Sequence, residues 1–180
     1  MEHLSSGDYK NALVLLKQAE SKMGSILLTP RNKFEKDQMA ALTFNNLGCY
    51  YKKASKPNVA LKYMKAALKL EKDLHHLPSH ICSTQLNICA TLSLQGKHRE
   101  AQSYANAAIT DLMLALKVLK INMVADAQQK LEIMQKQKIT TSMIDRVSNE
   151  NLQMMHQTLS LAYYNLAAEL EHTQDHTQAI

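Results

Sequence analysis

The chain has 180 residues, of which 46% are hydrophobic, enough for a substantial core in one or two domains. Aromatic residues make up only 5%, tryptophan is absent, and helix-forming residues such as leucine, alanine, lysine and glutamine are plentiful. The net charge of +5 is modest and the lysines are interspersed with acidic residues, so the charge gives no reason to infer nucleic-acid or membrane binding. The composition predicts an all-α protein.

Targeting and membrane-spanning segments are not expected. A transmembrane helix needs a run of about 18 or more apolar residues, and the sequence contains none. Residues 1–6 have neither the basic start nor the apolar core of a signal peptide. The three cysteines, at positions 49, 82 and 89, form an odd set without a recognisable spacing, which suits a reducing compartment. We therefore expect a cytoplasmic protein.

Glycine and proline, the strongest interrupters of helices, are confined to the first 96 positions. They predict a helix from about 31 to 54, a turn at 55–57, a second helix to about 73 and a further helix from Pro78. The rest of the chain has no strong breaker, so longer helices are expected there. The interrupting residues are Gly7, Gly24, Gly48, Gly96, Pro30, Pro57 and Pro78.

The stretch 44–70 predicts two closely packed antiparallel helices. Gly48 in the first helix and Ala60 in the second are small, which lets the two backbones approach each other. Larger apolar residues fill the seam between the helices and toward the next pair, namely Phe44, Leu47, Tyr51, Leu61, Met64 and Leu68. One such pair cannot bury its apolar faces alone, so it predicts neighbouring pairs.

The same pattern recurs after 41 residues. Gly48 and Cys89 are separated by 41 positions, and so are Ala60 and Ala101. This pattern resembles the tetratricopeptide repeat, and the long period with a proline in the loop resembles its kinesin-light-chain variety. The resemblance covers about 7–120 and 150–180. It implies an α-solenoid of antiparallel helix pairs that binds proteins without catalysis, in a cytoskeletal, motor or ciliary assembly.

Five segments follow from this interpretation. A turn and helix start at 7–13 has almost no first helix before it, so we expect the chain to begin inside a longer array rather than with a half repeat. Residues 163–170 and then 175–180 resemble a further helix, turn and helix start, so we also expect an open C-terminal end. The segments are a partial repeat at 1–28, repeats at 31–73 and 78–120, a hairpin tip at 124–144 and a partial repeat at 145–180.

The stretch 100–160 has two interpretations. One is a degenerate repeat, and the other, which we favour because glycine and proline are missing, is a projecting hairpin with an extended second helix of the repeat at 78–120. Two helices of ~30–40 residues would reach roughly 45–60 Å. Thr140, Thr141 and Ser142 together with Asp145 resemble a capping box before a new helix.

The predicted partner-binding residues are mostly amides. Asn46, Asn87 and Asn165 occupy the same position of three repeats, and the resemblance implies that this position faces the concave side. An amide offers both a donor and an acceptor to a peptide backbone, although each could instead cap its own surroundings. A chaperone-type carboxylate clamp is not expected, because Ser83 and Asn165 replace the required basic residues. The set is completed by Asn45, Lys52 and Lys53.

The alternative binding surface is a basic stripe formed by Lys62, Lys65, Lys69 and Lys72, which could meet nucleic acid or another anionic surface, although a solvated outer face is the preferred interpretation. A loop with His75, His76, His80 and Cys82 matches no zinc motif, and His172 and His176 lack the acidic base of a metalloprotease helix. No phosphate loop, Rossmann pattern or catalytic triad is recognisable. We expect no cofactor, no metal, no small-molecule substrate and no enzymatic activity.

Overall fold

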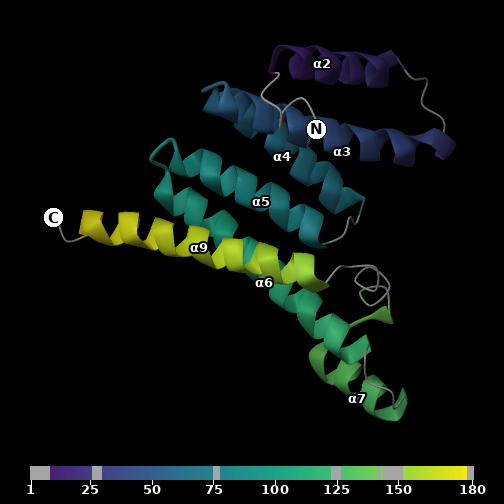
Figure 1. The fold of residues 1–180 in the computed structure, drawn as a ribbon. Coiled ribbons are helices and arrows are strands. Elements are labelled where there is room, and N and C mark those ends of the chain that lie inside the picture. The colour runs from purple at the N-terminus through teal and green to yellow at the C-terminus, as the bar shows by residue number, and fades with distance from the viewer. Residues whose placement is uncertain are drawn as a thin grey trace.

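The computed structural model describes residues 9–25, 30–74, 78–122, 127–141, 143 and 152–177. This part of the chain is helical and contains no strand, which confirms the all-α class. None of its helices is both long and apolar enough to cross a membrane. The helices are α2 (Tyr9–Ser25), α3 (Pro30–Lys53), α4 (Pro57–Asp73), α5 (Pro78–Ser93), α6 (His98–Asn122), α7 (Ala127–Gln137) and α9 (Leu152–Thr177) (Figure 1).

From α2 to α6 the helices form a stack in which each packs on its neighbours in the chain. Helix α2 lies on α3, α3 pairs with α4, α4 contacts α5, and α5 pairs with α6. Helix α9 packs on both α6 and α5 (Figure 1). As a result α3, α5 and α9 follow one another along one side of the stack, although they are far apart in sequence.

Two tight turns of the same kind join the paired helices. Ser55 and Gly96 have positive φ angles of 56° and 69°. In each turn a backbone N–H reaches back five residues, from Lys56 to the Tyr51 carbonyl at 2.9 Å and from Lys97 to the Leu92 carbonyl at 3.0 Å. This is the hydrogen bond of a helix end with a left-handed residue, which satisfies carbonyls left over at the last turn. The two turns are 41 residues apart. The 41-residue spacing of the sequence pattern is therefore also the spacing at which the backbone geometry repeats.

The predicted close approach of α3 and α4 is present at Gly48. A Cβ atom at this position would collide with Met64 Cγ and would lie 3.2 Å from the Ala60 carbonyl oxygen. Gly48 is buried, and Ala60 and Met64 are both fully buried. A side chain at position 48 would therefore push the two helices apart.

Two clusters of buried apolar side chains can be distinguished among the described residues. One joins α4, α5 and α6 and contains Leu61, Met64, Leu68, Ile81, Ile88, Cys89, Leu92, Ala101 and Ala105. The other joins α5 and α6 to α9 and to the segment after α7, and contains Cys82, Leu86, Ala108, Leu112, Ala115, Val118, Ile121, Ile139, Met155 and Ala162. Small residues dominate α6 on the side that meets its neighbours, which lets the helices pack closely.

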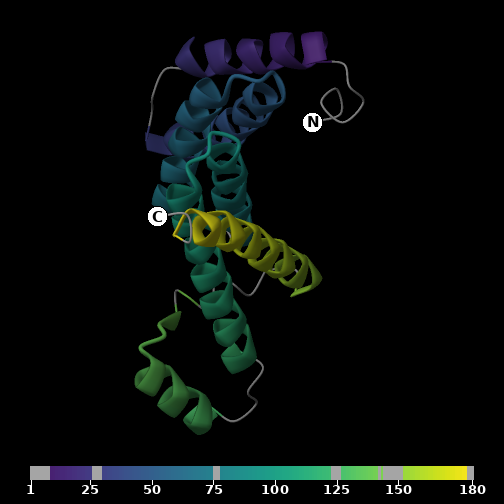
Figure 2. The ribbon, with the colours of Figure 1, turned by 90° about the vertical axis from the view of Figure 1, so that its left-hand side faces the viewer.

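The segment 100–160 differs from the expected hairpin of two long helices. Helices α6 and α9 have 25 and 26 residues, shorter than the expected ~30–40, and the 11-residue helix α7 lies between them in the chain. Figure 2 shows the C-terminal part of α6 extending beyond the other helices, with α7 beside its end. Helix α9 packs along α6, and the apolar stripe of α6 is also covered by Ile139 and, near its end, by α7. Much of 124–144, expected to be the tip, is therefore helical and packed.

The predicted cap at residue 140 is partly visible. Lys138, with a φ of 56°, follows α7, and the Met143 N–H donates to Thr140 Oγ1 at 3.3 Å. Ser142 and Asp145, the other residues of the predicted cap, lie outside the described residues.

The segment 175–180 is expected to contain a turn and a helix start, but its first three residues belong to α9, which is helical through Thr177. Its later turns are held on the start of α6. His98 Nδ1 lies 2.8 Å from Glu169 Oε2, and the His98 ring stacks on His172 with 4.3 Å between the ring centroids. Without a glycine or proline nearby, nothing in the sequence interrupts the helix there.

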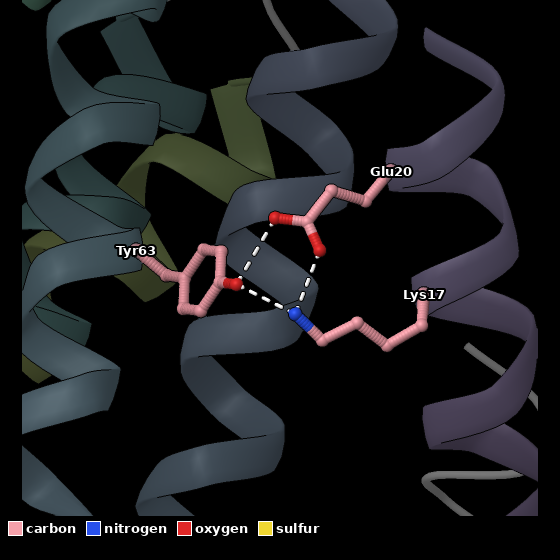
Figure 3. Close-up of polar contacts among 3 residues, drawn as sticks. All are labelled: Lys17, Glu20 and Tyr63. Carbon is pink, nitrogen blue, oxygen red and sulfur yellow. Dashed lines mark hydrogen bonds and ion pairs between the residues drawn. The ribbon is translucent and has the colours of Figure 1, made fainter. Parts of the chain in front are cut away.

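Helix α2 is tied to α4 by three polar side chains (Figure 3). Lys17 Nζ donates to Glu20 Oε2 and to the Tyr63 hydroxyl, both at 2.7 Å, and that hydroxyl lies 3.0 Å from Glu20 Oε1. The hydrogen bonds to Glu20 and Tyr63 raise the pKa of Lys17. Burial alone would raise the pKa of Glu20, but the hydrogen bonds from Lys17 and Tyr63 outweigh it and lower that pKa. Both groups therefore stay charged at neutral pH.

Candidate partner-binding face

Two adjoining cavities mark the side of the stack formed by α3, α5 and α9. The first, of about 380 Å³, opens between α3, α4 and α5, and we call it the Glu71 cavity. The second, of about 300 Å³, opens between α3, α5 and α9, and we call it the Asn87 cavity. Ser83 of α5 lines both. We refer to the two cavities and their rims as the α3–α5–α9 face.

The Glu71 cavity has an apolar rim and polar walls. Met39 and Leu42, on successive turns of α3, are 57% and 62% exposed and form the apolar part of the rim. The lining residues are Gln38, Met39, Leu42 and Asn45 of α3, Glu71 of α4, and His80 and Ser83 of α5.

Two residues that line this cavity each carry a buried oxygen atom with no hydrogen-bond donor in the described part of the chain. Glu71 is only 5% exposed; Thr84 Oγ1 donates to its Oε1 at 2.9 Å, while its Oε2 has no partner. The Oδ1 atom of Asn45 is likewise buried and without a partner. Burial raises the pKa of Glu71 from 4.5 to about 7, and the Thr84 hydrogen bond opposes that rise. Two residues lining the cavity thus carry acceptors that lack donors.

The Asn87 cavity gathers three of the predicted binding residues. Lys52 from the last turn of α3 donates from Nζ to Asn87 Oδ1 at 3.4 Å, and Asn165 of α9 lines the same space. Leu161, 51% exposed, supplies an apolar rim. The remaining lining residues are Ser83, Leu86, Ala90 and Thr158. Residues from three separate helices therefore meet where the sequence predicted a common binding position.

Asn46 does not lie where the sequence predicted a binding residue. It is buried, with 7% exposure, and does not line either cavity, whereas its neighbour Asn45 lines the Glu71 cavity. The side chains of adjacent residues on an α-helix point about 100° apart, so only one of Asn45 and Asn46 can face the cavity. The rotation of α3 about its axis places Asn45 there. Lys53 is exposed at the end of α3 and lines neither cavity. Equivalent positions in two repeats thus face different surroundings.

Glu71 was missed at the sequence level although the pattern contains a signal for it. It lies on the buried side of α4 in line with Met64, Ala67 and Leu68. An acidic residue in an apolar stripe at helical spacing is unusual, because a buried carboxylate loses its hydration. The surrounding lysines made it look like part of a solvated, charged helix.

The basic stripe lies apart from the cavities. Its four lysines, which are all exposed on α4, are Lys62, Lys65, Lys69 and Lys72. They line neither cavity. This arrangement agrees with the preferred interpretation of a solvated outer face.

Metal and thiol chemistry have little support in the described residues. These residues contain no group of three histidine, cysteine or acidic side chains arranged to hold a metal ion. His75 and His76 of the predicted cluster lie outside them, whereas His80 is exposed and Cys82 is buried. Burial raises the pKa of Cys49 and raises that of Cys89 to about 11, so both thiols are protonated and weakly nucleophilic at neutral pH.

The α3–α5–α9 face therefore combines unpaired acceptors, amides and exposed apolar side chains within two adjoining cavities. A comparison of the chain with protein-family models, with curated proteins and with solved structures found no match in any of the three.

Proposed function

We propose that this chain is a non-catalytic protein-binding scaffold of the tetratricopeptide type, which holds an extended peptide or a helical segment of a partner along the α3–α5–α9 face. The observation that carries the proposal is the pair of adjoining cavities, in which residues of three helices separated in sequence meet. A linear ligand fits such a face because the cavities follow one another along α5, with Ser83 between them.

The repeat character of the backbone supports the scaffold assignment. The turns at Ser55 and Gly96, the small buried residues Ala60 and Ala101, and the pairings of α3 with α4 and of α5 with α6 all repeat with one spacing. Stacked helix pairs present equivalent surfaces in register, which suits recognition of an extended chain. This is the geometric basis for extending the sequence resemblance to function.

The lining chemistry supports a protein ligand. Side-chain amides can both donate to and accept from a peptide backbone, as at Asn87 and Asn165. Exposed apolar side chains at the rims of both cavities, including Leu42 and Leu161, offer contact to apolar side chains of the partner. The cysteine pattern favours the cytoplasm, and by the sequence resemblance we place the scaffold in a cytoskeletal, motor or ciliary assembly.

The double variant Asn87→Ala with Asn165→Ala tests the proposal. A partner would first be identified by crosslinking mass spectrometry in native extract, and its affinity for wild type and variant then measured by calorimetry. Each hydrogen bond between a side-chain amide and the partner is worth about 0.5–1.5 kcal/mol, so we expect the loss of both amides to weaken binding about tenfold. The melting temperature should change little, because both side chains line a cavity rather than the core.

The matched control is Lys62→Ala with Lys69→Ala on the outer face of α4. We expect this pair to leave the affinity unchanged. If the lysine pair abolishes binding, and if affinity falls steeply with salt, the chain binds an anionic surface or nucleic acid through α4 instead. If the asparagine pair lowers stability without affecting binding, the amides are structural and the proposed face is wrong.

A further inference from the structure

We propose that the Glu71 cavity is a recognition site for the guanidinium group of an arginine side chain carried by the partner. This inference deepens the proposed function and rests on it. It names the chemistry that one of the two cavities recognises.

The acceptors in the cavity point to a ligand that brings donors. Glu71 Oε2 and Asn45 Oδ1 are both buried without a hydrogen-bond partner, and they come from different helices that wall the same cavity. Buried acceptors are nearly always satisfied in folded proteins, so two unsatisfied ones in one cavity mark a place for an incoming donor. Glu71 Oε1 is already engaged by Thr84, which leaves Oε2 for a ligand.

Arginine fits these acceptors better than other donors do. Its guanidinium carries five N–H groups in a planar fork, so it can donate to a carboxylate and to a neighbouring amide oxygen at once, whereas a lysine ammonium acts as a compact point charge. Its positive charge complements the carboxylate, and a charge-assisted hydrogen bond is about twice as strong as a neutral one.

The rim of the cavity fits the rest of an arginine side chain. Met39 and Leu42 are more than half exposed beside the polar walls, so they can cover the aliphatic stem while the guanidinium reaches Glu71. Ser83 connects this cavity to the Asn87 cavity, so the peptide on either side of the arginine can continue along α5. The competing occupant is a buried water molecule, which could also donate to both oxygens.

Arginine binding should depend on pH. A guanidinium requires the ionised form of Glu71, whose pKa of about 7 in the free chain makes ionisation incomplete near neutrality. With that pKa, the ionised fraction is about 0.9 at pH 8 and about 0.1 at pH 6, so affinity should fall about tenfold between them. His80 of α5 is the other titratable residue that lines the cavity, while the lining residues from α3 do not titrate.

The test uses the full chain with a ¹³C label on its methionine methyl groups and two tripeptides. These are acetyl-Leu-Arg-Leu-amide and the same peptide with neutral citrulline in place of arginine. Met39 lines the cavity and reports binding by NMR, whereas Met113 on α6 is the reference signal. We expect the arginine peptide to shift the Met39 signal, with an affinity about tenfold higher than that of the citrulline peptide.

Glu71→Gln is the decisive variant. Glutamine keeps an oxygen to accept from Thr84 but removes the charge, so the fold should persist while the preference for arginine over citrulline disappears. The pH dependence should disappear with it, and His80→Gln should retain both. Equal affinities of the two peptides for the wild type, an unchanged preference in Glu71→Gln, or an unmoved Met39 signal would each overturn the inference and leave water as the occupant.

A failed test of arginine recognition can be distinguished from a failed test of the proposed function. The tripeptides probe the Glu71 cavity alone, whereas the Asn87 and Asn165 variant probes the second cavity with the whole partner. If only the tripeptide experiment fails, the face still binds a partner but does not select arginine.

Discussion

Replacing Gly48 with valine is expected to lower the free energy of unfolding by about 3 kcal/mol, because the new side chain overpacks the contact between α3 and α4. The Cβ atom alone would collide with Met64 Cγ and come within 3.2 Å of the Ala60 carbonyl oxygen. Met64 is fully buried, so it has little room to move aside, and the carbonyl belongs to the backbone of α4. Urea denaturation followed by circular dichroism measures the change.

Gly24→Val is the matched control. A Cβ atom at Gly24 meets nothing within 4 Å, although Gly24 is also in a helix. Valine is slightly better than glycine in a helix, so stability should stay within about 0.5 kcal/mol of the wild type or rise. If both variants unfold at the same urea concentration as the wild type, α3 and α4 do not pack through Gly48.

Replacing Glu71 with glutamine is expected to stabilise the free chain at pH 8. The pKa of Glu71 is raised on folding from 4.5 to about 7, so the folded state holds a proton that the unfolded state releases. The wild type is therefore most stable, with respect to this group, below pH 4.5, and it loses that stability as pH rises toward and through 7. At ~1.4 kcal/mol per pKa unit, the loss reaches roughly 3 kcal/mol at pH 8.

Denaturation at pH 5 and pH 8 tests this prediction. The stability of the wild type should fall between pH 5 and pH 8, and Glu71→Gln should lack most of that fall. Glu20→Gln is the opposing control: because hydrogen bonds from Lys17 and Tyr63 lower the pKa of Glu20, its removal should destabilise the chain at neutral pH, by less than about 1 kcal/mol for this partly exposed group. A Glu71→Gln variant no more stable than the wild type at pH 8 would show that the carboxylate is hydrated in the free chain.

The buried carboxylate of Glu71 connects the stability of the free chain with the proposed binding of arginine. An unpaired buried acid destabilises the free protein, and a cation from a partner would relieve that penalty on binding. Proteins commonly retain destabilising groups where activity needs them. The same residue therefore gives a stability test without a ligand and a binding test with one.

Most helix boundaries of the first half could be predicted because their signals are local. Pro30, Pro57 and Pro78 each begin a helix, since the first turn of a helix does not use the missing N–H. Gly96 occupies the left-handed position of its turn. Ser55 takes the same conformation without being glycine, and the 41-residue period is what identifies it.

The second half could not be predicted in detail because its signals depend on tertiary packing. The apolar stripe of α6 indicated a partner but not whether one long helix or several short segments would cover it. The direction of an amide is similarly undetermined: Asn45 and Asn46 are adjacent, and the packing of α3 against α4 and α5 decides which one reaches a cavity. The burial of Glu71 is indicated by its place in the apolar stripe of α4, but the cavity that it lines depends on how α3, α4 and α5 pack.

The most direct test of the central claim is photo-crosslinking from defined positions in native extract. Benzoylphenylalanine would be placed at Leu42 or Leu161, which lie at the rims of the two cavities, and at Lys62 or Lys69 on the outer face of α4. We expect Leu42 and Leu161 to crosslink to the same partner and the two lysine positions not to. Adducts to that partner from Lys62 and Lys69, without adducts from Leu42 and Leu161, would contradict it.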